Sequence, residues 1–182
     1  MGCERPFKRR DLVVCDARPR GPSEHRYWLA RKWNLERPTI LFVLTNPSCA
    51  TEAIDDATVY RCYDIAGANG AGGFELVNLV AIRDPDSDAT RKRYLGRSDP
   101  ENDAVLSATI GRADSIVVGW GSFPWVQNRA REVYRSFLGD RRRLLPSGSI
   151  KCLGKNADGT PKHPARNSEL SLREWLCPRD WF

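Results

Sequence analysis

The chain has 182 residues, 41% hydrophobic and 29% charged, and its 29 lysines and arginines exceed its 23 aspartates and glutamates by six. This composition excludes a disordered or low-complexity chain and predicts one domain over residues 1–182, with residues 1–25 as an N-terminal extension. No apolar run reaches the roughly 20 residues that cross a bilayer. We therefore expect a cytoplasmic protein with no membrane partner, and the positive charge favours a polyanionic partner.

The cysteine and histidine content argues against a metal centre. The six cysteines form no Cys-x-x-Cys pair, and His25 and His163 are the only histidines that could complete a site. We expect no metal and no other cofactor. The spread of the cysteines favours reduced, mostly buried thiols over a disulfide framework.

Four short apolar runs bounded by glycine or proline are typical of strands buried on both faces. They cover residues 39–45, 74–80, 115–119 and 149–153. Because each run is continuous rather than alternating, we expect both faces of the sheet to be covered.

Helical spacing of apolar residues follows or separates these runs. The predicted helices cover residues 57–67, 99–111, 125–138 and 170–176. Residues 26–33 fit neither the helical nor the strand period, so both structures stay open there.

The alternation of strands and helices predicts an α/β fold, a three-layer α/β/α sandwich around a central, mostly parallel, four-stranded sheet. Ligands of such sheets bind outside the carboxyl ends of the strands. Four loops lie at this edge, residues 46–56, 78–86, 120–125 and 154–166. We expect the functional site there.

The first two loops carry amides and carboxylates. Asn46 follows a buried strand and can cap a turn or position a water. Asp55 and Asp56 precede a helix, so an N-cap and a carboxylate in the binding site are both open. Asn78 ends an apolar strand, where a buried amide needs partners, either in the core or on the edge of a bound base.

The other two loops carry aromatic and basic residues. Trp120 fits either the core or a stacking surface, and His163, held before a proline, fits either a turn or a catalytic role. Basic residues on or just beyond the loops can contact a phosphate backbone, with a solvated charged face as the alternative. The predicted DNA-binding residues are Arg83, Arg91, Lys92, Arg93, Lys155, Lys162 and Arg166.

Six motifs in order resemble a bacterial family known as a domain of unknown function. The motifs are FVLTNPS (residues 42–48), DDATVYRC (55–62), VNL (77–79), WG (120–121), CLG (152–154) and HP (163–164). This resemblance covers nearly the whole chain from Tyr27 onward.

The chain also resembles the uracil-DNA glycosylase superfamily. Asn46-Pro47 matches its motif after the first core strand, and Asn78 matches its strand-end asparagine. Residues 117–121 match its third strand, and His163-Pro164 matches its C-terminal loop motif. The resemblance implies a uracil-DNA glycosylase-like fold and a monofunctional DNA N-glycosylase, a hydrolase.

The resemblance also implies roles for single residues. Asn46 would orient the attacking water, His163 would stabilise the departing base, and Asn78 would bind the edge of a base flipped out of the duplex. Asp56 can place a carboxylate near the positively charged sugar, a role that comes from its location alone, so either Asn46 or Asp56 can activate the water. The further expected substrate-binding residues are Thr45, Ser48, Asp55, Tyr60, Tyr63, Trp120 and Gly121.

The loop from residue 48 to residue 56 bears on the substrate. It is long, contains the small Cys49 and Ala50, and offers polar side chains that can read a substituent. This favours a bulky or hydroxylated modified pyrimidine over uracil, with defence against phage DNA as the role and base repair as its alternative. We expect a monomer that binds DNA. A non-catalytic reader of modified bases and a hydrolase of free nucleosides or nucleotides are the alternative functions.

Overall fold

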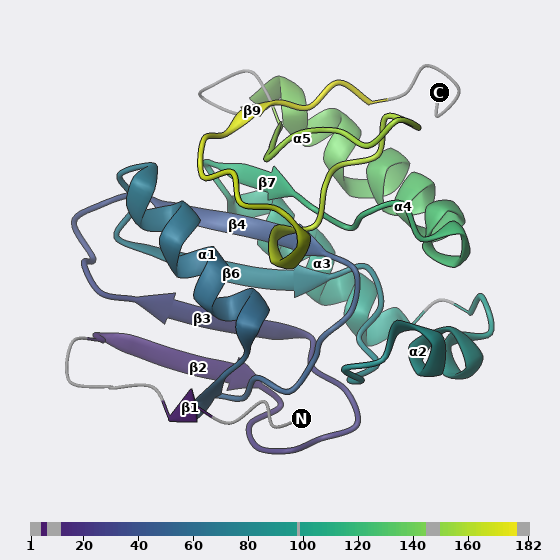
Figure 1. Ribbon diagram of the computed structural model, residues 1–182, viewed down its shortest axis with the longest axis horizontal. Coiled ribbons are helices and arrows are strands. Elements are labelled where there is room, and N and C mark those ends of the chain that lie inside the picture. The colour runs from purple at the N-terminus through teal and green to yellow at the C-terminus, as the bar shows by residue number, and fades with distance from the viewer. Residues whose placement is uncertain (1–4, 7–11, 98, 145–149, 178–182) are drawn as a thin grey trace.

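The computed structural model describes residues 5–6, 12–97, 99–144 and 150–177. Its centre is a seven-stranded sheet in the order β2-β3-β6-β4-β7-β8-β9 (Figure 1). The strands are β2 Val14–Arg18, β3 Trp28–Lys32, β6 Gly73–Asn78, β4 Thr39–Leu44, β7 Ile116–Val118, β8 Lys151–Cys152 and β9 Arg173–Glu174. A second, antiparallel sheet pairs β1 Arg5–Pro6 with β5 Ile54–Asp55.

The α/β class is confirmed, but the expected four-stranded, mostly parallel sheet is wrong. The four predicted runs are β4, β6, β7 and β8, and they form the parallel centre of a larger, mixed sheet. Antiparallel strands extend it at both ends, β3 and β2 beyond β6, and β9 beyond β8. These added strands carry charged residues, such as Arg31 and Lys32 in β3, which hide them from an analysis based on apolar runs.

Two segments behave differently from their sequence pattern. Residues 14–18, within the expected N-terminal extension, form β2 against β3. The helix predicted over residues 170–176 is wrong, because this segment pairs with β8 as β9. The N–H of Trp175 donates to the carbonyl of Ile150 at 2.7 Å, and the indole is buried, so tertiary packing determines the conformation here.

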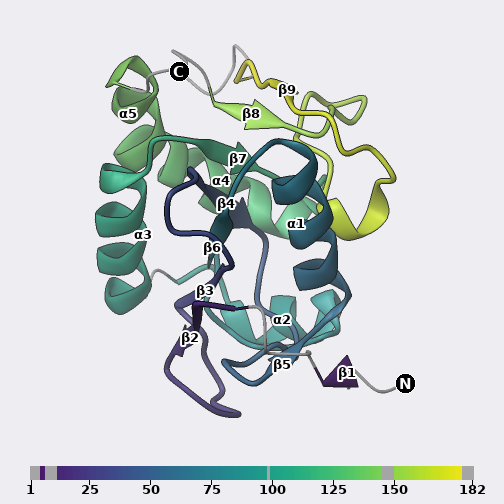
Figure 2. The ribbon, with the colours of Figure 1, turned by 90° about the vertical axis from the view of Figure 1, so that its left-hand side faces the viewer.

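The helices lie on both sides of the sheet, with α1 and α3 on opposite faces (Figure 2). They are α1 Ala57–Ala68, α2 Ser87–Tyr94, α3 Pro100–Arg112, α4 Gln127–Val133 and α5 Gly139–Leu144, with the 3-10 turns η2 Pro124–Val126 and η4 Pro164–Arg166 and the π-helical turn η3 Tyr134–Leu138. The predictions of α1, α3 and the run through α4 and η3 are confirmed, whereas α2 was not predicted. Within the described part of the chain, no helix is long and apolar enough to cross a membrane.

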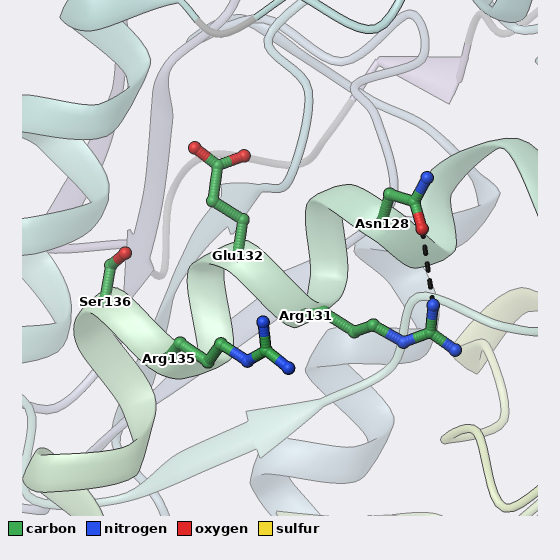
Figure 3. Close-up of a pocket in the computed structure, with 5 residues that line it drawn as sticks. All are labelled: Asn128, Arg131, Glu132, Arg135 and Ser136. Carbon is green, nitrogen blue, oxygen red and sulfur yellow. Dashed lines mark hydrogen bonds between the residues drawn. The ribbon is translucent and has the colours of Figure 1, made fainter. Parts of the chain in front are cut away.

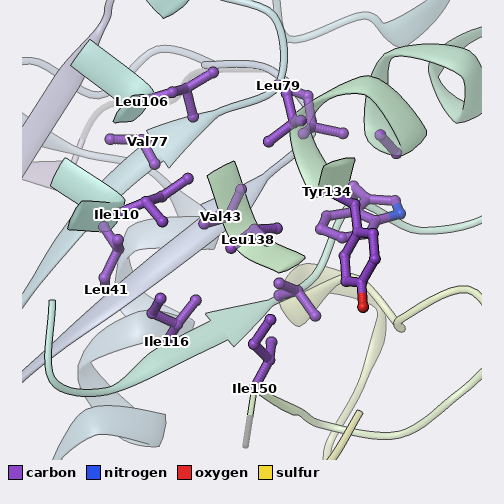
Figure 4. Packing of buried hydrophobic residues seen from close by; sticks show 14 of the residues in the cluster. Leu41, Val43, Val77, Leu79, Leu106, Ile110, Ile116, Tyr134, Leu138 and Ile150 are labelled. Atoms are coloured by element: carbon purple, nitrogen blue, oxygen red, sulfur yellow. The ribbon is translucent and has the colours of Figure 1, made fainter. Parts of the chain in front are cut away.

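Each face of the central strands has its own core. In β4, Phe42 packs toward α1. Leu41 and Val43 pack toward α3 and α4 (Figure 4). The same alternation in β6 places Leu76 on the α1 side and Val77 on the other. Because side chains of a strand point alternately to opposite faces, this register fixes the face on which each polar residue at the strand ends lies.

Candidate functional site

The loops that follow the parallel strands meet at one edge of the sheet, beyond the arrowheads in Figure 1. The chain leaves β4 for β6 on one side and later reaches β7 on the other, so the carboxyl ends of β4 and β7 form the topological switch point at which ligands of open α/β sheets bind. The hydroxyl of Thr45 donates to the carbonyl of Trp120 between these two strand ends at 2.7 Å. Thr45 is buried, and its hydroxyl ties the two strand ends together.

Asn78 carries a buried side-chain amide. It follows Leu76 by two residues in β6, so its side chain lies on the α1 face. The residue is 1% exposed, and neither Nδ2 nor Oδ1 forms a hydrogen bond with a described residue. A buried polar group left unsatisfied costs about 1–3 kcal/mol. Of the two interpretations that the sequence leaves open, hydrogen bonding within the core is not seen among the described residues, and recognition of a ligand remains.

His163 is a neutral imidazole at the N-terminus of η4. Its Nδ1 accepts the N–H of Ala165 at 3.3 Å, so the proton of the neutral ring lies on Nε2. Burial, together with the charge of Arg166, lowers the pKa of His163 to about 4. At neutral pH the ring can therefore donate a hydrogen bond from Nε2 without carrying a charge.

Gly121 brings the histidine loop against the end of β7. It has a φ of 74°, which favours glycine, and its N–H donates to the carbonyl of Pro161 at 2.9 Å. A Cβ at this position would lie 3.7 Å from the Cβ of His163. Gly121 thus positions the loop and adds no side chain for the substrate.

Asp56 is the N-cap of α1, as one of the two sequence interpretations predicts. Its Oδ1 accepts the N–H of Val59 at 2.9 Å, and its Oδ2 accepts the N–H of Ala50 at 3.2 Å. The carboxylate is also a charged neighbour of His163, Arg26 and Arg83. Burial lowers the pKa of each of these three groups, and the charge of Asp56 partly offsets that effect.

Asp55 makes a buried ion pair with Arg31 of β3. Its Oδ1 accepts Nε at 3.0 Å and Nη2 at 2.8 Å, and both side chains are fully buried. Burial raises the pKa of Asp55, and Arg31 opposes the rise. The carboxylate that was expected to bind substrate is therefore engaged in holding the β5 segment to β3.

Asn46 is fixed by its amide nitrogen. Nδ2 donates to the carbonyls of Pro47 and Asp84, at 3.0 and 2.9 Å, and to the hydroxyl of Thr90 at 3.0 Å. No described residue donates to Oδ1, which is the atom that can accept a hydrogen bond from water. Its neighbour Ser48 is half-buried, with its hydroxyl 3.6 Å from the Cys49 sulfur.

The three aromatic residues expected to bind the substrate lie in different places. Trp120 is 0% exposed on the α3 and α4 face, where it packs edge-to-face on Trp175 with ring centres 5.2 Å apart. Tyr63 packs on Trp33 and Phe74 within the α1 core. Tyr60 is half-buried one turn after the N-cap of α1, so it alone of the three is next to the site.

Sequence reasoning missed Arg26, which is 2% exposed. Its Nη1 donates to the carbonyl of Ala50 at 3.0 Å, whereas its Nε has no acceptor in the described part of the chain. Arg83, predicted to bind DNA, is half-buried, with Nη1 on the carbonyl of Gly21 at 3.1 Å and with Nε and Nη2 buried and unpartnered. The available signal for Arg26 was a charged residue leading into the apolar segment that begins at Tyr27.

We call Asn78, His163, Asp56, Arg26 and Arg83 the α1-face cluster. Asp56 interacts electrostatically with three of its members, and the amide of Asn78 lies on the face that α1 covers. The cluster combines a neutral donor, an amide that can both donate and accept, and two cations with unused N–H groups. Such a set can recognise an uncharged heterocycle together with an anionic group.

The remaining six predicted DNA-binding residues lie around the edge of the sheet at which the parallel strands end. We call these six residues the basic edge. Arg91, Lys92 and Arg93 lie in the last turns of α2 and are exposed, as are Lys155, Lys162 and Arg166 on the loop from residue 154 to residue 166. The guanidinium of Arg166 lies over the ring of Phe123 at 5.0 Å.

Of the hollows outside the cluster, two are lined by residues of α2 or α4. One of about 370 Å³ opens on the α3 face beyond β6 and includes Arg93 and Asn102, which extends the basic edge. The other lies on the outer surface of α4 and η3 (Figure 3). It is lined by Asn128, Arg131, Glu132, Arg135 and Ser136, all exposed or half-buried on one helical surface. This second hollow is a solvated helix face rather than a built site.

Among the described residues, no group of three histidine, cysteine, aspartate or glutamate side chains could hold a metal ion. Cys15, Cys62, Cys152 and Cys177 are in the reduced form, whereas Cys49 is disulfide-bonded, which corrects the expectation of reduced cysteines at that position.

A family model described as a protein of unknown function (DUF1643) matches residues 26–165, and the chain belongs to this family. No curated protein and no solved structure matches the chain.

Proposed function

We propose that this protein is a monofunctional DNA glycosylase that hydrolyses the N-glycosidic bond of a flipped, modified pyrimidine. The observation that carries the proposal is the buried side-chain amide of Asn78 at the end of β6, which has no hydrogen-bond partner among the described residues. His163 lies on the loop that packs against the end of β7. The resemblance to the uracil-DNA glycosylase superfamily at Asn46, Asn78 and His163 supports the same assignment.

In the proposed reaction, His163 stabilises the departing base. Cleavage of the N-glycosidic bond leaves negative charge on the base and positive charge on the sugar. The Nε2–H of His163 can donate to a pyrimidine oxygen as that charge develops. Because the pKa of His163 is about 4, the ring acts as a hydrogen-bond donor and does not transfer a full proton at neutral pH.

Asn46 and Asp56 act on the sugar side. The three acceptors of Nδ2 hold the Asn46 amide still, so Oδ1 can orient a water toward the anomeric carbon. Asp56 contributes negative charge near the sugar cation, while its oxygens keep their bonds to the backbone. Tyr60 supplies the stacking surface for the base.

Asn78 reads the base edge, because its amide offers both a donor and an acceptor. The loop from residue 48 to residue 56 accommodates a substituent on the base, which favours a modified pyrimidine over uracil. The basic edge around α2 holds the DNA backbone. We further propose that the protein acts in the cytoplasm as a monomer and requires no metal or other cofactor. Its role would be defence against phage DNA, with base repair as the alternative.

The experiment is an excision assay on oligonucleotides that carry normal, deaminated and modified bases, with abasic sites as the readout. The wild-type protein should produce abasic sites on at least one modified pyrimidine. The variants Asn46→Ala and His163→Ala should fold normally and lose this activity by about 100-fold or more. Unchanged excision rates in both variants would remove the proposed mechanism.

A non-catalytic reader of modified bases is the second candidate. It is favoured by one observation, that both oxygens of Asp56 already accept backbone N–H groups, so this carboxylate is poorly placed as a general base. A reader would bind modified DNA through Asn78 and release no base. Tight binding without abasic sites across the whole panel would select this function. Activity on free nucleosides or nucleotides alone would select the third alternative, a hydrolase of those compounds.

A further inference from the structure

The backbone holds Arg26 and Arg83 side by side. The N–H of Arg26 donates to the carbonyl of Ala81 at 2.9 Å, and the N–H of Arg83 donates to the carbonyl of Glu24 at 2.8 Å. The residues between these contacts form an antiparallel bridge. Because side chains alternate along paired segments, the two arginines leave this bridge on the same side.

Three nitrogen atoms of this pair have no acceptor among the described residues. Each guanidinium uses Nη1 for one carbonyl, of Ala50 for Arg26 and of Gly21 for Arg83. The Nε of Arg26 and both Nε and Nη2 of Arg83 are buried without a hydrogen bond. A guanidinium stays charged at any physiological pH, so these donors cannot be removed by deprotonation. They therefore call for an acceptor beyond the described residues.

The nearby carboxylates do not supply that acceptor. Both oxygens of Asp56 accept backbone N–H groups, and Oε2 of Glu52 accepts the N–H of Gly21 at 2.7 Å. These charges balance the arginines electrostatically, which explains how two cations can lie so close together. A group with several oxygens can accept hydrogen bonds from more than one of the unused donors.

We propose that Arg26 and Arg83 together bind the phosphate group of the nucleotide whose base contacts Asn78. Planar guanidinium groups match the oxygens of phosphate, and paired arginines surround it from two sides. The identity of the nucleotide rests on the proposed function, but the phosphate site does not. The phosphate can be a diester of the DNA backbone or the monoester of a free nucleotide, because both present the same oxygens.

The first experiment tests the phosphate site without any nucleic acid. The melting temperature Tm of the full chain is measured with and without inorganic phosphate for the wild type, Arg83→Gln, Arg26→Lys and Arg173→Gln. Arg173 is the matched control, since its side chain is 68% exposed on β9. We expect phosphate to raise Tm equally in the wild type and the control, and less than half as much in the other two variants.

Equal Tm shifts in all four proteins would overturn the inference. Arg26→Lys keeps the charge but loses the Nε donor and the planar fork, so it tests geometry rather than charge. If Arg26→Lys does not fold, the Tm shift of Arg83→Gln alone is the test. Arg83 is half-buried, and this substitution removes two of the three nitrogen atoms without an acceptor.

The second experiment separates the two sources of phosphate. Binding is measured for deoxycytidine, for deoxycytidine 5′-monophosphate, and for an oligonucleotide with an abasic-site analogue and one neutral methylphosphonate linkage placed at each position in turn. For a DNA diester, one neutral linkage should weaken wild-type binding about tenfold. The same linkage should cause no further loss in Arg83→Gln.

Each other result has a distinct meaning. Binding of the monophosphate without binding of the oligonucleotide would keep the phosphate site and reject the DNA glycosylase. If every neutral linkage weakens Arg83→Gln as much as the wild type, the phosphate site is rejected. Base excision by the wild-type protein would then stand unaffected.

Discussion

Two buried arginines, Arg26 just before β3 and Arg31 within β3, differ in how their N–H groups are used. Arg31, in β3, places Nε and Nη2 on Asp55 and Nη1 on the carbonyl of Ala30 at 2.9 Å. Arg26, just before β3, is almost as buried but leaves Nε without an acceptor. A structural arginine is satisfied by its own chain, whereas an unsatisfied one at the edge of a sheet indicates a place for a ligand.

Breaking the Arg31–Asp55 pair should give the largest effect on stability. Arg31→Met leaves a buried carboxylate without its partner, which costs about 3–5 kcal/mol in the free energy of unfolding. Arg83→Gln should change it by less than about 1 kcal/mol, because that side chain is half-buried and two of its donors are unused. Denaturant unfolding of both variants measures the difference. Equal destabilisation by the two substitutions would mean that Arg83 is structural.

Two asparagines sharpen the comparison. Nδ2 of Asn102 donates to the carbonyls of Asn78 and Leu79, both at 3.1 Å, so Asn102→Leu should cost about 1–3 kcal/mol. Asn78→Leu removes an unpartnered amide, and we expect no loss of stability or a small gain. Thermal unfolding of the two variants provides the test. If Asn78→Leu is the more destabilising change, Asn78 has a partner in the core.

The titration of His163 should appear in the pH dependence of stability. The folded-state pKa of about 4 lies below the ordinary 6.5, so between these values the unfolded chain binds a proton that the folded chain does not. The free energy of unfolding should therefore fall as the pH drops from about 6.5 toward 4. His163→Gln should lack this contribution. Urea unfolding of both proteins between pH 4 and pH 7 checks the prediction. The same change of the free energy of unfolding with pH in both proteins would contradict it.

Charge reversal on α2 should weaken DNA binding more than charge reversal on another basic surface. Replacing Arg91, Lys92 and Arg93 with glutamate should weaken DNA binding and lower its salt-dependence slope by about 2 to 3, since fewer counterions are released. Reversing Arg131 and Arg135, in the hollow of Figure 3, should change the slope by less than about 1. Titrations of DNA binding at several salt concentrations give the slopes. Equal losses from both sets would indicate diffuse charge.

The elements that could be predicted from the sequence are those determined by residues close together in the chain. β4 is a continuous apolar run with both faces buried, and α3 begins at Asp99, whose side chain accepts the N–H groups of Glu101 and Asn102. The segment at Arg173–Glu174 could not be predicted, because its exposed residues pair with β8 only through the folded chain.

The same limit applies to the candidate site. Asn78 and His163 were chosen because they lie at the end of a predicted strand and in the loop after one, and ligand positions in open sheets follow from topology. The partners of each polar side chain did not follow from the sequence. Burial and pairing decide that Asp55 serves Arg31, that Trp120 lies in the core and that Arg26 has an unused donor.

The central claim is most directly tested by the release of free base. Wild-type protein and Asn78→Leu are incubated with phage DNA that carries modified cytosine or thymine and with uracil-containing DNA of equal length, and released bases are identified by mass spectrometry. The account predicts release of the modified base by the wild type, little release of uracil, and neither reaction by folded Asn78→Leu. Robust uracil release with no activity on modified DNA would contradict the proposed substrate. Equal release by Asn78→Leu and the wild type would contradict the site itself.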